Sequence, residues 1–184
     1  MPSAWQKRCF AEHLHAGGVV AYPTEAVFGL GCDPLNSEAV SQLLRLKRRA
    51  RNKGLILIAS DFSQIEPYLK PLSESVISMI YDQVQQPTTW LLPAKESVPK
   101  WLTGGHKTIA VRLVQHGLAK ELCELVGMAI VSTSANISGC VSIRTAHQTR
   151  LKFSGKGVYT INGKVGKAKK PSRIIDPLLN KQIR

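Results

Sequence analysis

The chain has 184 residues, a formal net charge of +13 and 43% hydrophobic residues. This length suits one domain with a buried core, and we expect residues 1–184 to form a single domain. No apolar run approaches the ~20 residues of a membrane-spanning helix, and the N-terminus lacks the apolar centre of a signal peptide. We therefore expect a cytoplasmic protein without membrane association, and the charge favours a polyanionic partner such as RNA, DNA or a nucleotide.

Helices and strands are predicted to alternate along the chain. From the N-terminus we expect a helix over 4–15, a strand over 18–23, a structured loop over 23–34, a helix from Asn36 or Ser37, and a strand over 54–60. Further on we expect helices over 61–69 and 73–84, strands over 88–94 and 107–114, a helix over 116–127, a strand beginning within 127–136, and short strands over 157–163 and 171–177. This alternation indicates an α/β fold with a mixed sheet.

Two of the expected helices have recognisable apolar faces. In the first, we expect Trp5, Cys9 and Leu14 to face the core. In the second, four residues share one face at helical spacing, namely Val40, Leu43, Leu44 and Lys47.

The four cysteines show no metal-ligand spacing. They are Cys9, Cys32, Cys123 and Cys140, and no pair of them forms a CxxC motif. Because of this spacing, we predict no structural metal bound by the protein. Disulfides are not expected either, since the protein is expected to be cytosolic.

Three segments share a layout in which an apolar strand ends in small or hydroxylated residues. They are YPTEAVFGLG, IVSTSANISG and the start of PSRIID. Ligands of open α/β sheets lie at strand ends, where hydroxyls and Gly-rich backbone can bind carboxylates or phosphates. Each segment alone is equally typical of a turn with capping hydroxyls, but three of them beside two basic stretches favour a polar cavity.

The stretch RLKRRARNK, residues 45–53, is the most basic in the chain. Lys47 and Arg49 can converge on one anion only if the helix ends near Lys47, because residues two apart on a helix point in different directions. A Lys point charge beside an Arg fork suits a triphosphate. The alternatives are a solvated helix end and a nuclear-localisation patch.

Common nucleotide-binding and hydrolase motifs are missing. The sequence has no GxxxxGK[ST], no GxGxxG and no GxSxG. If the protein binds a nucleotide, it uses a different arrangement.

Several motifs together resemble the YrdC family, in order and over nearly the whole chain. They are PTEAVFGLG, Lys47-x-Arg49, the KGLI that follows, AVR at 110–112, STSANISG at 132–139 and PSRIID at 171–176. The pair of Lys-x-Arg with Ser134-x-Asn136 is specific in combination, and the length resembles the short bacterial form. The resemblance implies a twisted mixed α/β sheet with flanking helices around a large, basic, concave cavity.

The resemblance also implies a function. Family members condense L-threonine, bicarbonate and ATP to threonylcarbamoyl-adenylate and release pyrophosphate. The product serves the threonylcarbamoyladenosine modification of tRNA through partner transferase proteins. Binding of tRNA or double-stranded RNA is ascribed to the basic surface, and Mg²⁺ is expected to accompany the phosphates of ATP.

Site residues follow from the same resemblance. Lys47 and Arg49 are expected to carry the catalysis by electrostatic positioning. The ATP site is expected to consist of Lys47, Arg49, Ser134 and Asn136. The threonine site is expected to consist of Thr24, Arg112, Ser132 and Ser172, with Arg112 holding the carboxylate. No nucleophile or general base is assigned.

Some positions depart from the family pattern. Phe28 stands where the family often has Tyr, Ala50 where it has Pro, and Val84–Gln86 where a WPGP stretch begins. Longer relatives carry a His at Leu57 or Ile58. Phe28 removes one hydroxyl, Ala50 makes the loop less rigid, and the missing His predicts differently arranged threonine contacts in its region. The Lys-x-Arg and Ser-x-Asn pairs are intact.

Two other functions compete with this one. The first is an RNA-binding protein that uses the basic cavity without chemistry. The second is a relative that handles carbamoyl-adenylate for metal-centre maturation, but that form normally lies within a much longer chain with zinc-finger segments.

Overall fold

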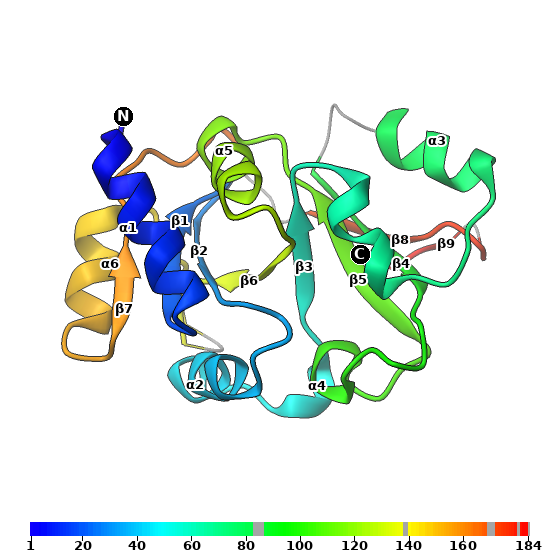
Figure 1. The fold of residues 1–184 in the computed structure, drawn as a ribbon, viewed down its shortest axis with the longest axis horizontal. Coiled ribbons are helices and arrows are strands. Elements are labelled where there is room, and N and C mark those ends of the chain that lie inside the picture. The colour runs from blue at the N-terminus through cyan, green and yellow to red at the C-terminus, as the bar shows by residue number, and fades with distance from the viewer. Residues whose placement is uncertain (83–86, 138–139, 169–171, 180, 184) are drawn as a thin grey trace.

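A single nine-stranded sheet organises the molecule (Figure 1). The computed structural model describes residues 1–82, 87–137, 140–168, 172–179 and 181–183. The strands are β1 Val19–Pro23, β2 Phe28–Gly31, β3 Ile56–Ala59, β4 Thr88–Pro93, β5 Thr108–Leu113, β6 Ile130–Ser134, β7 Val158–Thr160, β8 Arg173–Asp176 and β9 Lys181–Gln182. The α-helices are α1 Ala4–His15, α2 Ser37–Lys47, α3 Glu74–Asp82, α4 Lys100–Thr103, α5 Gly117–Val126 and α6 Ala146–Phe153.

The sheet is mixed, and its order is β7-β1-β2-β6-β3-β5-β4-β8-β9. β6 lies between β2 and β3 and is antiparallel to both. Three pairs are parallel, namely β1 with β7, β3 with β5, and β4 with β8. The predicted α/β class with a mixed sheet is therefore confirmed.

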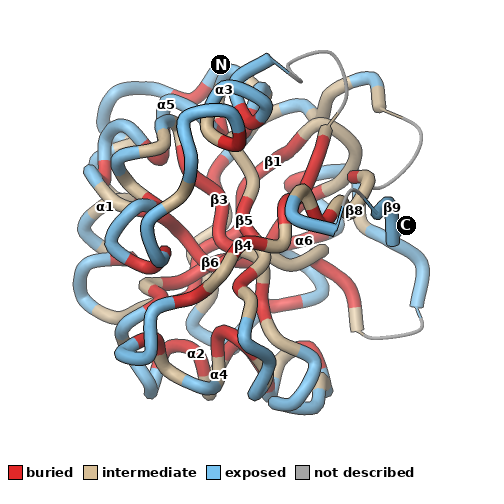
Figure 2. The backbone as a smooth tube through the Cα atoms, turned by 90° about the vertical axis from the view of Figure 1, so that its right-hand side faces the viewer, coloured by how far each residue is buried: buried red, intermediate tan, exposed pale blue. Residues whose placement is uncertain are grey.

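Helices cover both faces of the sheet, and the buried residues lie between the layers (Figure 2). On one face, α1 and α5 pack against side chains that include Tyr22 and Ile58. On the other face, α2 packs against a larger cluster that includes Leu30 and Leu57. Adjacent strand residues thus point into different cores, as the two-residue period of a strand requires.

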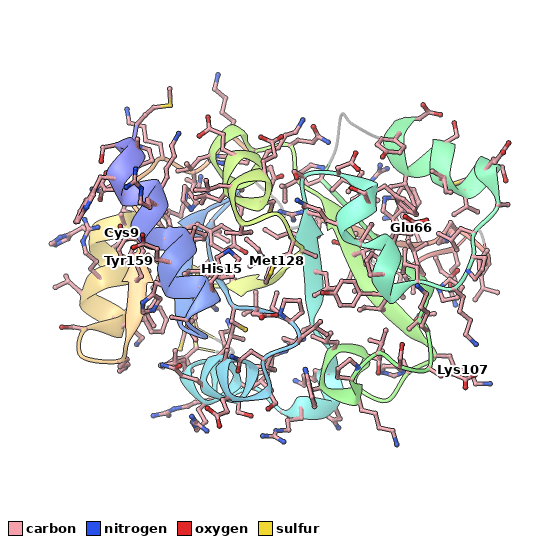
Figure 3. The ribbon with its side chains drawn as sticks, in the orientation of Figure 1. Cys9, His15, Glu66, Lys107, Met128 and Tyr159 are labelled. Atoms are coloured by element: carbon pink, nitrogen blue, oxygen red, sulfur yellow. The ribbon has the colours of Figure 1, made fainter. Side chains whose placement is uncertain are left out.

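Helix α1 begins with a capping box in which Ser3 and Gln6 exchange hydrogen bonds. Its buried residues include Phe10 and Leu14, whereas Trp5 is 68% exposed. The prediction that Trp5 faces the core is therefore wrong, because the helix turns its Phe10 face inward. Beside α1 lies β7, whose Tyr159 is close to Cys9 in Figure 3 and donates to the Gln6 carbonyl over 3.0 Å.

The predicted loop over 23–34 contains a strand, β2, which corrects the sequence-based prediction. β2 pairs with β1 on one side and β6 on the other. Its glycines conceal the strand pattern but allow the close approach, since a Cβ on Gly31 would lie 2.5 Å from the Val131 carbonyl oxygen.

Other local predictions also need correction. Residues 61–69 form two 3₁₀ turns, Phe62–Gln64 and Glu66–Tyr68, because Pro67 cannot donate within a continuous helix. The helix expected over 73–84 spans Glu74–Asp82, and Val84 lies outside the described residues. Helices α4 and α6 were not predicted, since both are short.

None of the helices described has both the length and the apolar character that crossing a bilayer requires.

Candidate active site

A cavity of about 870 Å³ lies on the face of the sheet that carries α5. β5 contributes alternate residues to its wall, namely Thr108, Ala110 and Arg112, while Ile109 and Val111 are buried on the opposite face. The period of two along the strand therefore places Arg112 in the cavity.

The three hydroxyl-rich segments meet in this cavity. Thr24 comes from the β1–β2 turn, Ser132 and Ser134 from β6, and Ser172 from the residue before β8. β6 pairs directly with β2, and Ser134 stands opposite Gly29. The sheet order thus brings together residues that lie more than 100 positions apart in the sequence.

The charged lining residues within the described part of the chain are mostly basic. Arg49, Lys53, Arg112 and Arg144 line the cavity, with Glu25 as the carboxylate among them. Arg49 and Lys53 come from the segment after α2, while Arg112 and Glu25 form an ion pair. The described lining therefore contains one ion pair, Glu25–Arg112, and three further cationic side chains, those of Arg49, Lys53 and Arg144.

Lys47 joins the end of α2 to the end of β6. Its side chain is 2% exposed, and its ammonium donates to the backbone carbonyls of Ser134, at 2.5 Å, and of Asn136. The Asn136 side-chain oxygen lies 3.2 Å away and the Ser134 hydroxyl 3.3 Å away. Lys47 and Asn136 are not among the residues that line the cavity, so Lys47 lies behind Ser134.

The helix end explains this position. Lys47 is the last residue of α2, and Arg48 adopts a left-handed conformation with φ of 49°. The chain therefore turns immediately after Lys47, which sends Lys47 toward β6 while Arg49 reaches the cavity. Burial and, to a smaller extent, the positive charge of Arg49 together lower the pKa of the Lys47 ammonium to about 8.

Arg49 is held at the wall by its own loop. Its Nη2 donates to the carbonyls of Lys53 at 3.2 Å and Gly54 at 3.0 Å. Its Nε is buried and has no hydrogen-bond partner among the residues described. Arg51, by contrast, donates to the Ser41 hydroxyl over 2.8 Å and does not line the cavity.

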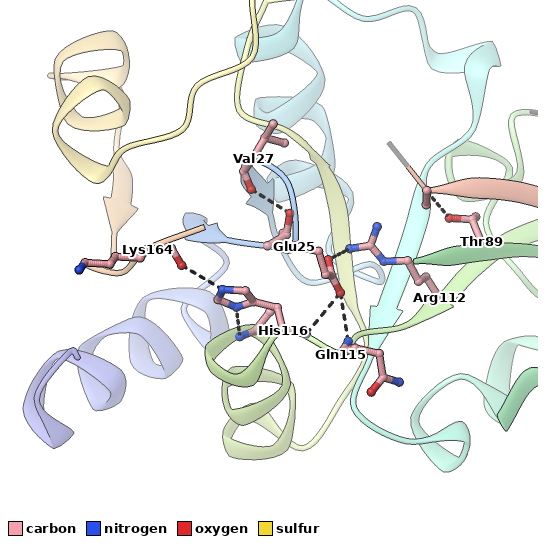
Figure 4. A network of polar contacts seen from close by, with 10 residues as sticks. Glu25, Val27, Thr89, Arg112, Gln115, His116 and Lys164 are labelled. Atoms are coloured by element: carbon pink, nitrogen blue, oxygen red, sulfur yellow. Dashed lines mark hydrogen bonds and ion pairs between the residues drawn. The ribbon is translucent and has the colours of Figure 1, made fainter. Parts of the chain in front are cut away.

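Glu25 and Arg112 form the second charged element of the site (Figure 4). Their closest atoms are 2.5 Å apart, and the exposed fractions of the two side chains are 13% for Glu25 and 12% for Arg112. The other carboxylate oxygen accepts the backbone N–H groups of Gln115 and His116. Burial opposes ionisation of Glu25, but the Arg112 charge and these N–H groups outweigh it and lower the pKa of Glu25.

Sequence reasoning missed Glu25 as a site residue. The signal was present, because Glu25 directly follows Thr24 inside the PTEAVFGLG motif in a chain with few acidic residues. Only the fold shows that the turn after β1 reaches the end of β5, 87 positions away.

Several hydroxyl groups near the residues expected to bind L-threonine already have hydrogen-bond partners within the protein. Thr24 donates to the Val27 carbonyl over 2.8 Å, so its oxygen can serve only as an acceptor toward a ligand. The Ser172 and Thr89 hydroxyls are 2.8 Å apart. Burial raises the pKa of Tyr22, whose hydroxyl donates to the Val131 carbonyl over 3.5 Å.

The described residues contain no group of three or more His, Cys, Asp or Glu side chains that could hold a metal ion.

The Sua5/YciO/YrdC family model, described as "Telomere recombination", matches residues 12–184. The chain belongs to this family.

Curated members of the family are similar over nearly their full length. A protein of Photorhabdus laumondii named Threonylcarbamoyl-AMP synthase is 49% identical over 173 residues, which cover 93% of this chain and 91% of that protein. A protein of Nitrosococcus oceani with the same name is 46% identical over 180 residues, covering 98% and 97%.

Solved structures of the family share the fold. P. abyssi Sua5 complexed with L-threonine matches with a TM-score of 0.88 and 35% identity, over 96% of this chain and 52% of that one. This chain thus spans about half of the Sua5 chain. E. coli YciO matches with a TM-score of 0.79 at 23% identity and supports the fold alone.

Proposed function

We infer that the chain condenses L-threonine, bicarbonate and ATP to threonylcarbamoyl-adenylate and releases pyrophosphate. The observation that carries this inference is one cavity lined both by Arg49 and Ser134 and by Thr24 and Arg112. The family relatives named Threonylcarbamoyl-AMP synthase and the threonine complex of Sua5 support catalysis over RNA binding without chemistry.

The reaction needs positioning more than covalent catalysis. The threonine ammonium first loses a proton; the resulting amine attacks the carbon of bicarbonate, a C–N bond forms, and water leaves. A carbamate oxygen then attacks the α-phosphorus of ATP, and the bond to pyrophosphate breaks. Because carbamate and triphosphate are both anions, cations must offset their repulsion and hold them in contact.

We propose that the region around Arg49 binds ATP. The Arg49 guanidinium and the nearby Lys53 ammonium line the cavity and offer donors to phosphate oxygens. Ser134 lines the cavity, and Lys47 fixes the end of β6 by its bonds to Ser134 and Asn136. Lys47 and Asn136 therefore act on ATP from behind the lining, by charge and by positioning Ser134.

We propose that the region around Arg112 binds threonine. Arg112 receives the carboxylate, as guanidinium groups do in a charge-assisted pair. The Thr24 oxygen can accept from the threonine amine or hydroxyl, because its own proton is committed to Val27. Ser132 and Ser172 complete the polar wall.

Mg²⁺ is proposed as a companion of ATP. The carboxylate among the described lining residues, Glu25, is committed to Arg112 and two backbone N–H groups. We therefore expect triphosphate oxygens and water to supply the ligands of any Mg²⁺, as is usual for nucleotide substrates.

A threonine-dependent pyrophosphate assay tests the proposed function. Purified protein would receive ATP, Mg²⁺, labelled bicarbonate and threonine, and pyrophosphate and the labelled adenylate would be measured. We expect release only when both threonine and bicarbonate are present. Release that is independent of threonine would show that the proposed reaction is wrong.

We further propose that the product, a reactive mixed anhydride, passes in the cytoplasm to transferase proteins that act on tRNA, and that tRNA or double-stranded RNA binds the basic surface. The exposed Arg45 and Arg48 on and after α2 are suitable phosphate contacts. Filter binding at increasing salt concentrations tests this contact. We expect affinity to fall steeply with salt, and a flat response would exclude a phosphate-contact surface.

A further inference from the structure

The Glu25–Arg112 ion pair differs from the other charged side chains of the described lining, Arg49, Lys53 and Arg144, which are all cationic. The guanidinium of Arg49 lines the cavity with the nearby Lys53, whereas Arg112 faces a carboxylate 2.5 Å away. An unbalanced cationic group attracts phosphates, but a close ion pair has little net charge and places negative charge beside any anion that approaches.

Glu25 is fixed from several sides. Its carboxylate accepts from Arg112, Gln115 and His116, and its backbone carbonyl accepts the Ala168 N–H over 3.0 Å. Gly166 packs so closely that an added Cβ would lie 2.7 Å from the Glu25 carbonyl oxygen. The carboxylate therefore cannot move aside for an incoming anion without losing several hydrogen bonds.

The start of α5 reinforces this arrangement (Figure 4). His116 caps the helix through Nδ1, which accepts the Ala119 N–H over 3.3 Å. Its Nε2 therefore carries the proton and donates to the Lys164 carbonyl over 2.9 Å. The segment 164–168, which packs against Glu25, is thus hydrogen-bonded to the same turn that supplies the Gln115 and His116 N–H groups.

We propose that Glu25 is a positioning and specificity-determining residue for the amino-acid substrate. It orients the Arg112 guanidinium so that a donor outside the ion pair faces the substrate carboxylate. It also balances the charge of Arg112, so that this end of the cavity accepts a zwitterionic amino acid and rejects inorganic phosphate or the phosphates of ATP. Glu25 is not the general base, because its bound donors stabilise the ionised carboxylate. This proposal rests on the proposed function.

Substitution Glu25→Gln tests the proposal, with Glu121→Gln as the matched control. Glu121 lies on α5 and pairs with Lys7 at the surface over 2.6 Å, so both variants lose one carboxylate from an ion pair. For Glu25→Gln we expect the KM for threonine to rise at least about tenfold, since a buried Arg donor loses its charged partner. The KM for ATP should change less than about twofold, because Arg49 is unaffected.

Phosphate inhibition supplies a readout that a purely structural role would not change. At saturating ATP, we expect inorganic phosphate to inhibit Glu25→Gln competitively with threonine, at least about tenfold more strongly than the wild type. Glu121→Gln should behave as the wild type. An unchanged phosphate constant, or an equal rise in both KM values, would overturn the proposal.

Glu25→Asp keeps the charge but shortens the side chain, and this variant tests the proposal if Glu25→Gln does not fold. We expect a raised KM for threonine without new phosphate inhibition, and an unchanged KM would overturn the proposal. A wild type without threonine-dependent pyrophosphate release would instead refute the proposed function, so the two failures are distinguishable.

Discussion

The Lys47 ammonium lies 3.2 Å from the Asn136 side-chain oxygen, although 89 positions separate the two residues. The same ammonium donates to the backbone carbonyls of Ser134 and Asn136. A cation at the end of α2 thus holds the polar end of β6 in place. Stability and the arrangement of Ser134 in the cavity depend on the same bonds.

Lys47→Met should lower stability and abolish most activity. Methionine fills similar volume but leaves the Ser134 and Asn136 carbonyls without their donor, which we expect to cost about 1–3 kcal/mol of unfolding free energy. Urea unfolding and the pyrophosphate assay measure the two effects. Arg45→Met is the control, because Arg45 is exposed in the last turn of the same helix. Equal effects of both substitutions would contradict the role of Lys47.

The contribution of Lys47 to stability should increase with pH. Its pKa is lowered to about 8 in the folded protein, while the ordinary value is 10.5. Between these values the unfolded chain binds the proton that the folded chain has released, so stability rises with pH. The unfolding free energy of the wild type minus that of Lys47→Met should therefore be larger at about pH 9.5 than at about pH 7. A difference that shrinks with pH would contradict the lowered pKa.

The Glu25–Arg112 pair should make stability sensitive to acid. The pKa of Glu25 is lowered in the folded protein, so its contribution is present above the ordinary glutamate pKa and is lost as pH falls through the folded value. The wild type should therefore lose more unfolding free energy between about pH 7 and pH 3 than Glu25→Gln does. Urea midpoints of both proteins at each pH measure this, and parallel losses would exclude a stabilising carboxylate at this position.

Gly166→Ala should disturb the threonine region through packing alone. The new Cβ would lie 2.7 Å from the Glu25 carbonyl oxygen and 3.0 Å from its Cα, so the turn that carries Thr24 and Glu25 must shift. We expect a loss of about 1–3 kcal/mol in stability and a higher KM for threonine. Gly117→Ala, with nothing within 4 Å of the added Cβ, should be neutral. A neutral Gly166→Ala would show that the turn tolerates the shift.

The sequence indicated the strands and the polar segments because these depend on local patterns. The apolar run before Ser60 predicted β3, and the strand expected over 107–114 corresponds to β5. It could not predict β2, whose glycines give no strand pattern and whose pairing partners lie in β1 and β6. Its tertiary environment decides that element.

The same distinction applies to the site. Lys47 and Arg49 are distinctive in the sequence by charge and spacing, and their convergence requires a helix end near Lys47, which α2 has. That Lys47 lies behind the lining, whereas Arg49 lies within it, depends on the left-handed Arg48. Glu25 has no periodic signal, since its significance comes from Arg112 in a strand distant in sequence.

The central place of β6 has a consequence for biosynthesis. β1 and β2 form one hairpin and β3, β4 and β5 another unit, yet all five strands precede β6 in the chain. As the polypeptide leaves the ribosome, β2 and β3 cannot be joined into one sheet until residues 130–134 have been synthesised, because β6 pairs with both strands. A messenger truncated before that point would yield two half-sheets with open edges, which are prone to aggregation and a suitable target for chaperones.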